Sequence, residues 1–94
     1  MLNDKDKRFL KSKCNQLKAT ITIGKDGLSH NVVKNIMLDL EAHELVKIDI
    51  LKTADINLDS LPIDLAAQTG AHIIQQIGRS IVLYKDSKKH IYLK

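Results

Sequence analysis

Residues 23–29, Ile-Gly-Lys-Asp-Gly-Leu-Ser, decide the fold of this 94-residue chain, because they join a predicted strand to a predicted helix through two glycines three positions apart. Glycine tolerates a positive φ and has no Cβ, so such a loop can turn sharply and let a bulky chain lie against its peptide groups. Ser29 can cap the following helix, whose free N–H groups suit phosphate. Two glycines at this spacing also mark ordinary tight turns, so the sequence around them has to separate the two interpretations.

The residues on either side of this GxxG loop, residues 24–27, carry the periodicity of a strand and of a helix. Residues 20–23 alternate polar and β-branched side chains, which predicts a strand with Ile21 and Ile23 on one face. After the loop, apolar residues at i, i+1, i+4, i+5 and i+8 predict a half-buried helix: Val32, Val33, Ile36, Met37 and Leu40. Residues 45–51 alternate again, so the run predicts a parallel βαβ unit with a right-handed crossover.

A further helix is predicted before the loop, over residues 4–17. Its apolar residues fall at i, i+4 and i+7: Leu10, Cys14 and Leu17. Asn3 or Asp4 can cap its first turn, and Phe9 is expected on the side of the core. Cys14, the single cysteine of the chain, is therefore expected to be a small buried hydrophobic residue.

Turn residues organise the second half of the chain. After a polar connection, Asp59 or Ser60 can cap a short helix that has Pro62 in its first turn and Gly70 just past its end. Helices commonly begin and end on these residue types, so we expect a third helix here.

Two further strands are predicted at residues 72–77 and 80–85. The Gly78-Arg79 pair between them is what a type II′ hairpin requires, so these strands should be antiparallel neighbours. A short extended piece is expected at residues 90–93. Since no linker or repeat divides the chain, we expect one domain spanning residues 1–94.

The charge of the chain is unevenly distributed. Residues 1–25 carry seven Lys/Arg against two Asp, a net +5, and residues 79–94 carry five against one, a net +4. Residues 26–78 carry three against eight, a net −5. Basic ends of this kind favour a polyanion-binding face, although lysines also simply solvate exposed surfaces. At about 100° per residue, Lys7, Lys11 and Lys18 would form one basic stripe beside the apolar face of the first helix, unless Lys18 lies beyond its last full turn.

Several other functions are not expected from the sequence. The loop matches neither GxxxxGK[ST] nor GxGxxG, and the four histidines lack metal-ligand spacing, so we expect no cofactor and no metal. His43 and Glu44 could in principle form an acid/base pair, which leaves a small hydrolase as a remote alternative. No apolar run approaches the roughly 20 residues that span a bilayer. The charged N-terminus precedes no signal segment, so a cytoplasmic protein is expected.

The aromatic residues restrict what kind of nucleic acid would bind. Only Phe9, Tyr84 and Tyr92 are present, and the first two are expected in the core. Reading single-stranded bases by stacking needs two or three exposed rings. The sequence therefore favours binding through phosphate and shape, as in a folded RNA with duplex segments.

Five stretches, in this order, carry a family resemblance: residues 23–29 after the basic helix, His-Glu-Leu-Val-Lys-Ile at 43–48, Thr-Gly-Ala at 69–71, Gln-Ile-Gly-Arg at 76–79 and Val-Leu-Tyr-Lys at 82–85. In them the chain resembles the CRM domain family, named for chloroplast RNA splicing and ribosome maturation, in its stand-alone bacterial YhbY-like form. The resemblance implies an α+β, two-layer α-β-α-β-α-β-β domain with a mixed four-stranded sheet. That fold is similar to the C-terminal domain of translation initiation factor three.

The resemblance also implies an RNA-binding site. The family's GxxG loop, which resembles that of KH domains, maps onto four residues here: Gly24, Lys25, Asp26 and Gly27. Its basic first helix maps onto four more: Lys7, Arg8, Lys11 and Lys18. Asp26 departs from the family's loops, which often carry a neutral or basic residue there, and a carboxylate opposes phosphate. We expect Asp26 to cap the loop or the following helix instead.

Our leading hypothesis is therefore a cytoplasmic, non-enzymatic RNA-binding protein, monomeric in isolation. The family's bacterial members are associated with precursors of the large ribosomal subunit, so the expected partner is rRNA in pre-large-subunit particles. The alternative is a protein-interaction module whose acidic middle, residues 39–64, docks a basic ribosomal partner.

Overall fold

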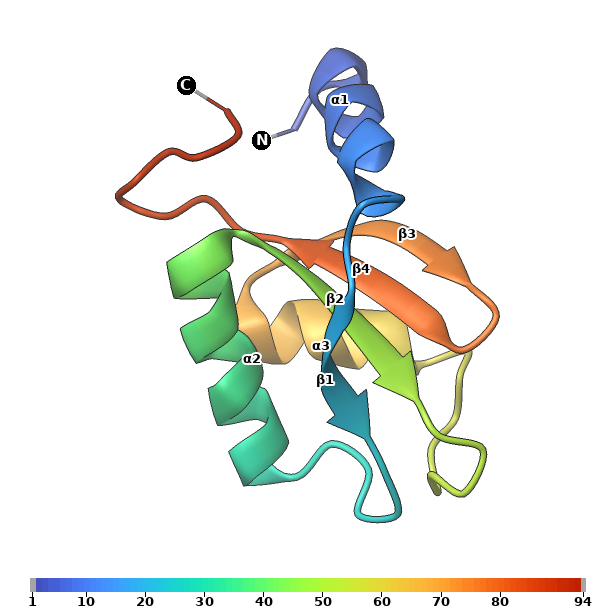
Figure 1. Ribbon diagram of the computed structural model, residues 1–94. Helices are drawn as coiled ribbons and strands as arrows, with labels where there is room; N and C mark the ends of the chain where they lie inside the picture. Colours follow the sequence, from blue (N-terminus) through green and yellow to red (C-terminus); the bar gives the residue numbers. More distant parts are fainter. Residues whose placement is uncertain (1, 94) are drawn as a thin grey trace.

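The computed structural model describes residues 2–93. It contains seven elements, shown in Figure 1: α1 (Asp4–Cys14), β1 (Ala19–Ile23), α2 (His30–His43), β2 (Leu45–Ile50), α3 (Leu61–Thr69), β3 (His72–Ile77) and β4 (Ser80–Tyr84). The strands form one sheet in the order β1-β2-β4-β3. The predicted α-β-α-β-α-β-β order and the mixed four-stranded sheet are confirmed. None of the helices among residues 2–93 is long and apolar enough to cross a bilayer.

The pairing of the strands follows the predicted connections. β1 and β2 are parallel neighbours, as expected of a βαβ unit, whereas β4 runs antiparallel to both β2 and β3. Ile77 pairs with Ser80 across the β3–β4 turn. Gly78 adopts φ +55 and Arg79 has no positive φ, which agrees with the type II′ turn because that turn needs a positive φ at its first central residue.

The sheet buries both of its faces. α2 and α3 cover one face, where Ile36, Leu40, Leu61 and Leu65 pack on buried strand residues that include Ile48. On the opposite face α1 and the C-terminal tail cover a second cluster: Leu10, Cys14, Leu45, Ile74, Val82 and Tyr84, with Leu17, Tyr92 and Leu93 packed against it. Consecutive residues of β4 alternate between the clusters, as the period of a strand requires.

α1 is shorter than predicted, and one of its apolar residues lies outside the core. Asn3 caps it, since its Oδ1 accepts the Asp6 N–H at 2.8 Å. The helix ends at Cys14, which is buried as expected. The prediction that Phe9 faces the core is wrong: its side chain is 41% exposed, and the Lys13 ammonium lies 5.3 Å from the centre of its ring. Only one side of a short helix can face the sheet, and Leu10 and Cys14 occupy that side.

α3 and the tail differ from prediction in detail. Ser60 precedes the first residue of α3, but its side chain caps no helix N–H, and Asn57 orders this turn by accepting the Asp59 N–H on Oδ1 at 2.8 Å. Gly70 ends the helix in a left-handed conformation, φ +74, as predicted. Through residue 93 the tail forms no strand, so the extended piece predicted at residues 90–93 is wrong.

Candidate nucleic-acid interface

The GxxG loop is a tight turn that leads directly into the capped start of α2. The Gly27 N–H donates to the Gly24 carbonyl at 3.0 Å, which closes the turn around Lys25 and Asp26. Both of these side chains are exposed at its tip. Ser29 caps α2, because its Oγ accepts the Val32 N–H at 3.2 Å. The predicted strand, loop and capped helix are therefore confirmed.

The two glycines of the loop have different roles. Gly27 is buried and adopts φ +64, a left-handed conformation in which a Cβ is strained. Gly24 has no positive φ, and a Cβ added there would meet Leu51 Cδ1 at 3.6 Å, an ordinary van der Waals distance. The turn itself therefore requires glycine only at position 27, and the glycine at position 24 is free to serve close approach of a ligand.

Alanine substitutions should separate these two roles. Gly27→Ala is expected to lower the free energy of unfolding by about 1–2 kcal/mol, because a left-handed φ is strained for any L side chain. Gly24→Ala should change it by less than about 0.5 kcal/mol, since the new methyl group makes only ordinary contacts. Urea unfolding of both variants measures the difference, and equal losses would contradict the assignment.

Asp26 does not cap the loop. Its side chain is exposed and takes part in no hydrogen bond among residues 2–93, while Ser29 supplies the cap of α2. The expectation of local capping is therefore wrong, because the turn is closed by backbone groups and the serine lies one position before α2. Asp26 follows Lys25 at the exposed tip, so its negative charge reduces the net charge that the loop presents.

The predicted basic residues do not all gather at the loop. Lys7, Arg8 and Lys11 are exposed on α1, and Lys18 is exposed in the connection between α1 and β1. Lys18 is thus not part of the helical stripe, because α1 ends before it. Figure 1 shows α1 and the GxxG loop at opposite ends of β1, in a molecule whose longest dimension is 37 Å. The exposed Lys25 of the loop and the basic residues of α1 therefore lie at opposite ends of β1, and one ligand would have to extend between them.

One basic residue that sequence reasoning did not place in the site comes to the loop end of the sheet. Arg79 lies in the β3–β4 turn, where its exposed side chain donates from Nη1 to the Leu51 carbonyl at 3.2 Å. Leu51 follows β2, and its N–H donates to the carbonyl of Ile23, the residue before the loop, at 2.9 Å. The sequence predicted the Gly78-Arg79 pair as a turn. Its place at the loop end of the sheet depends on how β4 pairs with the other strands, and that pairing was the only signal of it.

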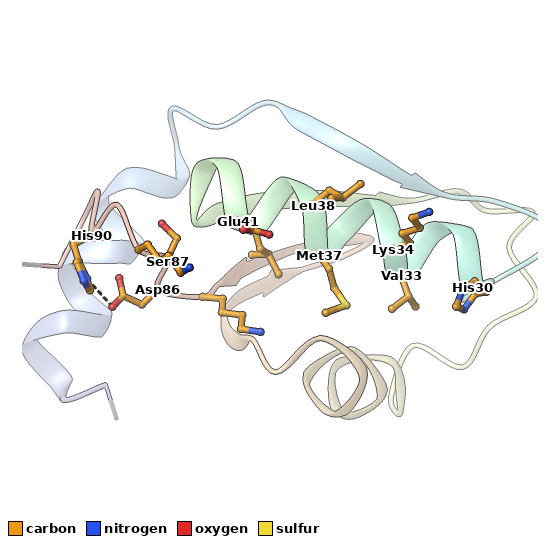
Figure 2. A pocket seen from close by; sticks show the side chains of 12 residues that line it. His30, Val33, Lys34, Met37, Leu38, Glu41, Asp86, Ser87 and His90 are labelled. Carbon is orange, nitrogen blue, oxygen red and sulfur yellow. Dashed lines mark hydrogen bonds and ion pairs between the residues drawn. The ribbon is translucent and has the colours of Figure 1, made fainter.

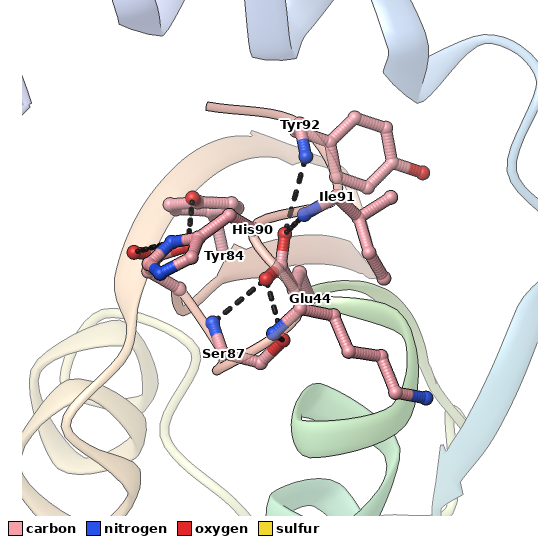
Figure 3. A network of polar contacts seen from close by, with 8 residues as sticks. Glu44, Tyr84, Ser87, His90, Ile91 and Tyr92 are labelled. Carbon is pink, nitrogen blue, oxygen red and sulfur yellow. Dashed lines mark hydrogen bonds and ion pairs between the residues drawn. The ribbon is translucent and has the colours of Figure 1, made fainter. Parts of the chain in front are cut away.

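Glu44 is not available for acid/base chemistry. Its buried carboxylate accepts four hydrogen bonds from the tail: from Ser87 N and Oγ at 2.7 and 2.6 Å, and from Ile91 N and Tyr92 N at 2.9 and 3.2 Å (Figure 3). Burial acts to raise the pKa of this carboxyl, but these bonds favour its charged form and the pKa is lowered. The remote hydrolase alternative therefore loses its base, and no cluster of metal-binding side chains occurs within residues 2–93.

Part of the acidic middle of the chain is engaged within the fold. Glu44 is buried, the Asp39 carboxylate accepts a bond from the Thr20 hydroxyl, and Asp49 accepts one from the Ser80 hydroxyl at 2.8 Å. Three of its seven carboxylates thus make contacts inside the protein, and the other four are exposed on α2, α3 and the connection between β2 and α3.

A groove of about 730 Å³ runs along the outer side of α2 and the tail. Figure 2 shows Met37 and Val33 of the predicted apolar stripe in it, together with charged side chains of both signs. Charges on its rim include Lys34, Glu41, Asp86 and Lys88. This mixture specifies no ligand chemistry, so the groove is not assigned to the site.

A model of the CRS1/YhbY (CRM) domain matches residues 2–85. The Bacillus subtilis protein named probable RNA-binding protein YqeI is 38% identical over 90 residues, covering 96% of this chain and 94% of that protein. A Haemophilus influenzae protein named RNA-binding protein is 34% identical over 89 residues, covering 94% and 89%. The solution structure of the Staphylococcus aureus hypothetical protein SAV1595 superposes with a TM-score of 0.82 at 33% identity, covering 100% and 98%. The chain therefore belongs to the CRS1/YhbY (CRM) domain family.

Proposed function

We propose that this protein binds RNA through the sugar-phosphate backbone, with the GxxG loop as the main contact. The observation that carries the proposal is the exposed Lys25 at the tip of a tight turn that leads into the capped N-terminus of α2. Lysine supplies charge, glycine permits close approach, and a helix N-terminus favours anions. Relatives in Bacillus subtilis and Haemophilus influenzae are named as RNA-binding proteins, which supports RNA as the ligand.

The separation of α1 and the GxxG loop bears on the shape of the RNA. A ligand that reaches both has to span the length of β1, which a duplex stem can do. With few exposed aromatic rings for stacking, the protein would recognise an A-form stem by its shape and phosphates. Binding would stabilise one conformation of the RNA and involve no bond chemistry.

The more specific proposal is that this RNA is rRNA in precursors of the large ribosomal subunit, bound in the cytoplasm by a monomer. It is motivated by the family resemblance of the five stretches described above. The alternative, docking of a basic ribosomal protein, has a weaker basis because the acidic middle is divided among several elements and partly engaged within the fold.

Crosslinking in cells tests the identity of the RNA. Ultraviolet crosslinking of the protein, followed by sequencing of the attached RNA, should recover large-subunit rRNA at a few discrete positions, enriched in fractions that sediment as precursors. Crosslinks that simply follow RNA abundance, or that map to the small subunit, would contradict the ribosomal proposal. Recovery of no RNA above the level of an uncrosslinked control would favour the docking alternative.

A further inference from the structure

The β3–β4 turn brings a second cation to the end of the sheet where β1 enters the GxxG loop. Ile23 of β1 pairs with Ile50 of β2, and on the other side of β2 Asp49 pairs with Ser80, the residue after Arg79. Two strand spacings, about 10 Å, therefore separate the backbone of Ile23 from that of Arg79. Figure 1 shows this turn and the chain after β2 at the end of β2 that lies beside the loop.

A series of hydrogen bonds fixes Arg79 relative to the loop. Its carbonyl accepts the Ile50 N–H at 2.8 Å, and its guanidinium donates to the Leu51 carbonyl at 3.2 Å. The Leu51 N–H in turn donates to the Ile23 carbonyl at 2.9 Å, directly before Gly24. The position of the guanidinium thus depends on Leu51, which is itself bonded to Ile23, the residue before the loop. An exposed arginine held in this way loses less freedom when it binds a ligand than one on a mobile side chain.

The guanidinium retains most of its capacity for binding. Arginine has five N–H donors in a planar fork, and the Leu51 carbonyl engages one nitrogen. Within residues 2–93 no carboxylate forms an ion pair with Arg79, and the carboxylate of nearby Asp49 already accepts the Ser80 hydroxyl. The exposed charge is uncompensated, and the geometry of the fork suits the oxygens of a phosphate.

We propose that Arg79 binds a phosphate of the same RNA that the GxxG loop contacts, so that the loop end of the sheet holds the backbone at two points. Lys25 forms one point and Arg79 the other, with Leu51, 47% exposed, between them. This inference rests on the proposed RNA-binding function. It differs from the sequence-based prediction, which placed the second cationic contact on α1.

Salt-dependent binding of a defined RNA tests the proposal. The probes are a fluorescein-labelled 20-base-pair RNA duplex and transcribed large-subunit rRNA. They are titrated with the wild type, Arg79→Gln, Arg79→Lys, Lys25→Gln and the control Lys34→Gln, which removes an exposed charge on α2. We expect Arg79→Gln to weaken binding about five- to tenfold and to reduce the slope of log K against log salt by about 0.7–0.9, one phosphate contact. Arg79→Lys should keep the slope but bind about two- to threefold more weakly, because the fork is lost.

The outcomes separate failure of this inference from failure of the proposed function. If Arg79→Gln lowers thermal stability but leaves the salt slope as in the wild type, while Lys25→Gln reduces that slope, Arg79 only supports the Leu51 carbonyl and the inference is overturned. If neither variant changes the slope, or if the wild type binds both RNAs without salt dependence, the proposed function fails as well. If Lys34→Gln weakens RNA binding as much as Arg79→Gln does, the loss reflects only the lower net charge of the protein, and the inference is overturned.

Discussion

Replacing Glu44 by glutamine should lower the free energy of unfolding by about 3 kcal/mol at pH 7, because hydrogen bonds to a buried charged acceptor are among the most stabilising in proteins. The carboxylate accepts two bonds on each oxygen, whereas an amide nitrogen accepts none and would face N–H donors. Urea unfolding at pH 7 measures the loss. Glu41→Gln is the matched control on the exposed side of α2, and it should change stability by less than about 0.5 kcal/mol.

The effect of Glu44 should depend on pH in a defined direction. Its pKa in the folded protein lies below the ordinary value of 4.5, so its stabilisation is complete above that value and is lost as the pH falls through the folded pKa. The wild type should therefore keep its full advantage over Glu44→Gln at pH 7 and 5, and the advantage should shrink as the pH falls below 4.5 toward the folded pKa. An advantage that grows as the pH is lowered would show that the charge does not hold the tail.

The consequences of this contact reach beyond one residue. Glu44 holds Ser87, Ile91 and Tyr92, and Tyr92 packs against the cluster beneath α1. Losing the contact should free the tail and uncover part of that cluster. Trypsin cleavage after Lys88 and Lys89 should therefore become faster in Glu44→Gln than in the wild type.

The features that could be predicted from the sequence are those that act over a few residues. Ser29 caps the helix that follows it, Gly70 ends α3, and Gly78 gives the hairpin its positive φ. Each of these effects needs only the local backbone, and the apolar periodicity between them determines which side of each element is buried. The order of elements and the loop that connects β1 to α2 follow directly.

The features that could not be predicted depend on contacts between distant residues. The bonds of Glu44 join residues 43 to 48 positions apart, and the bond from Arg79 to Leu51 spans 28 positions. No local pattern distinguishes a glutamate that holds the tail from one that caps a helix. The same holds for the distance between α1 and the loop, since it is determined by where α1 packs on the sheet.

Periodicity also misplaced the end of α1 for a physical reason. Leu17 continues the apolar spacing of Leu10 and Cys14, yet the helix has ended before it. The Leu17 N–H still donates to the Cys14 carbonyl, at 3.1 Å, and its side chain packs against the cluster beneath α1. A turn after the helix thus keeps the residue on the buried side, so burial alone did not reveal the boundary.

Reversing the charge of Lys25 should weaken RNA binding at least tenfold, because Lys25→Asp removes a phosphate contact and adds a repulsive carboxylate beside Asp26. Lys25 is exposed at the tip of the turn and makes no hydrogen bond within residues 2–93. The melting temperature should therefore stay within about 2 °C of the wild type. Lys34→Asp makes the same change in net charge on α2, in the turn after its capped N-terminus, and serves as the control.

The most direct test is a fluorescence anisotropy titration of a labelled 20-base-pair RNA duplex with wild type, Lys25→Asp and Lys34→Asp at several salt concentrations. Binding through the loop predicts a rise in Kd of tenfold or more for Lys25→Asp alone, with a salt slope smaller by about 0.7–0.9, and little change for Lys34→Asp. Equal affinity and equal slope for wild type and Lys25→Asp would contradict a loop-centred RNA contact.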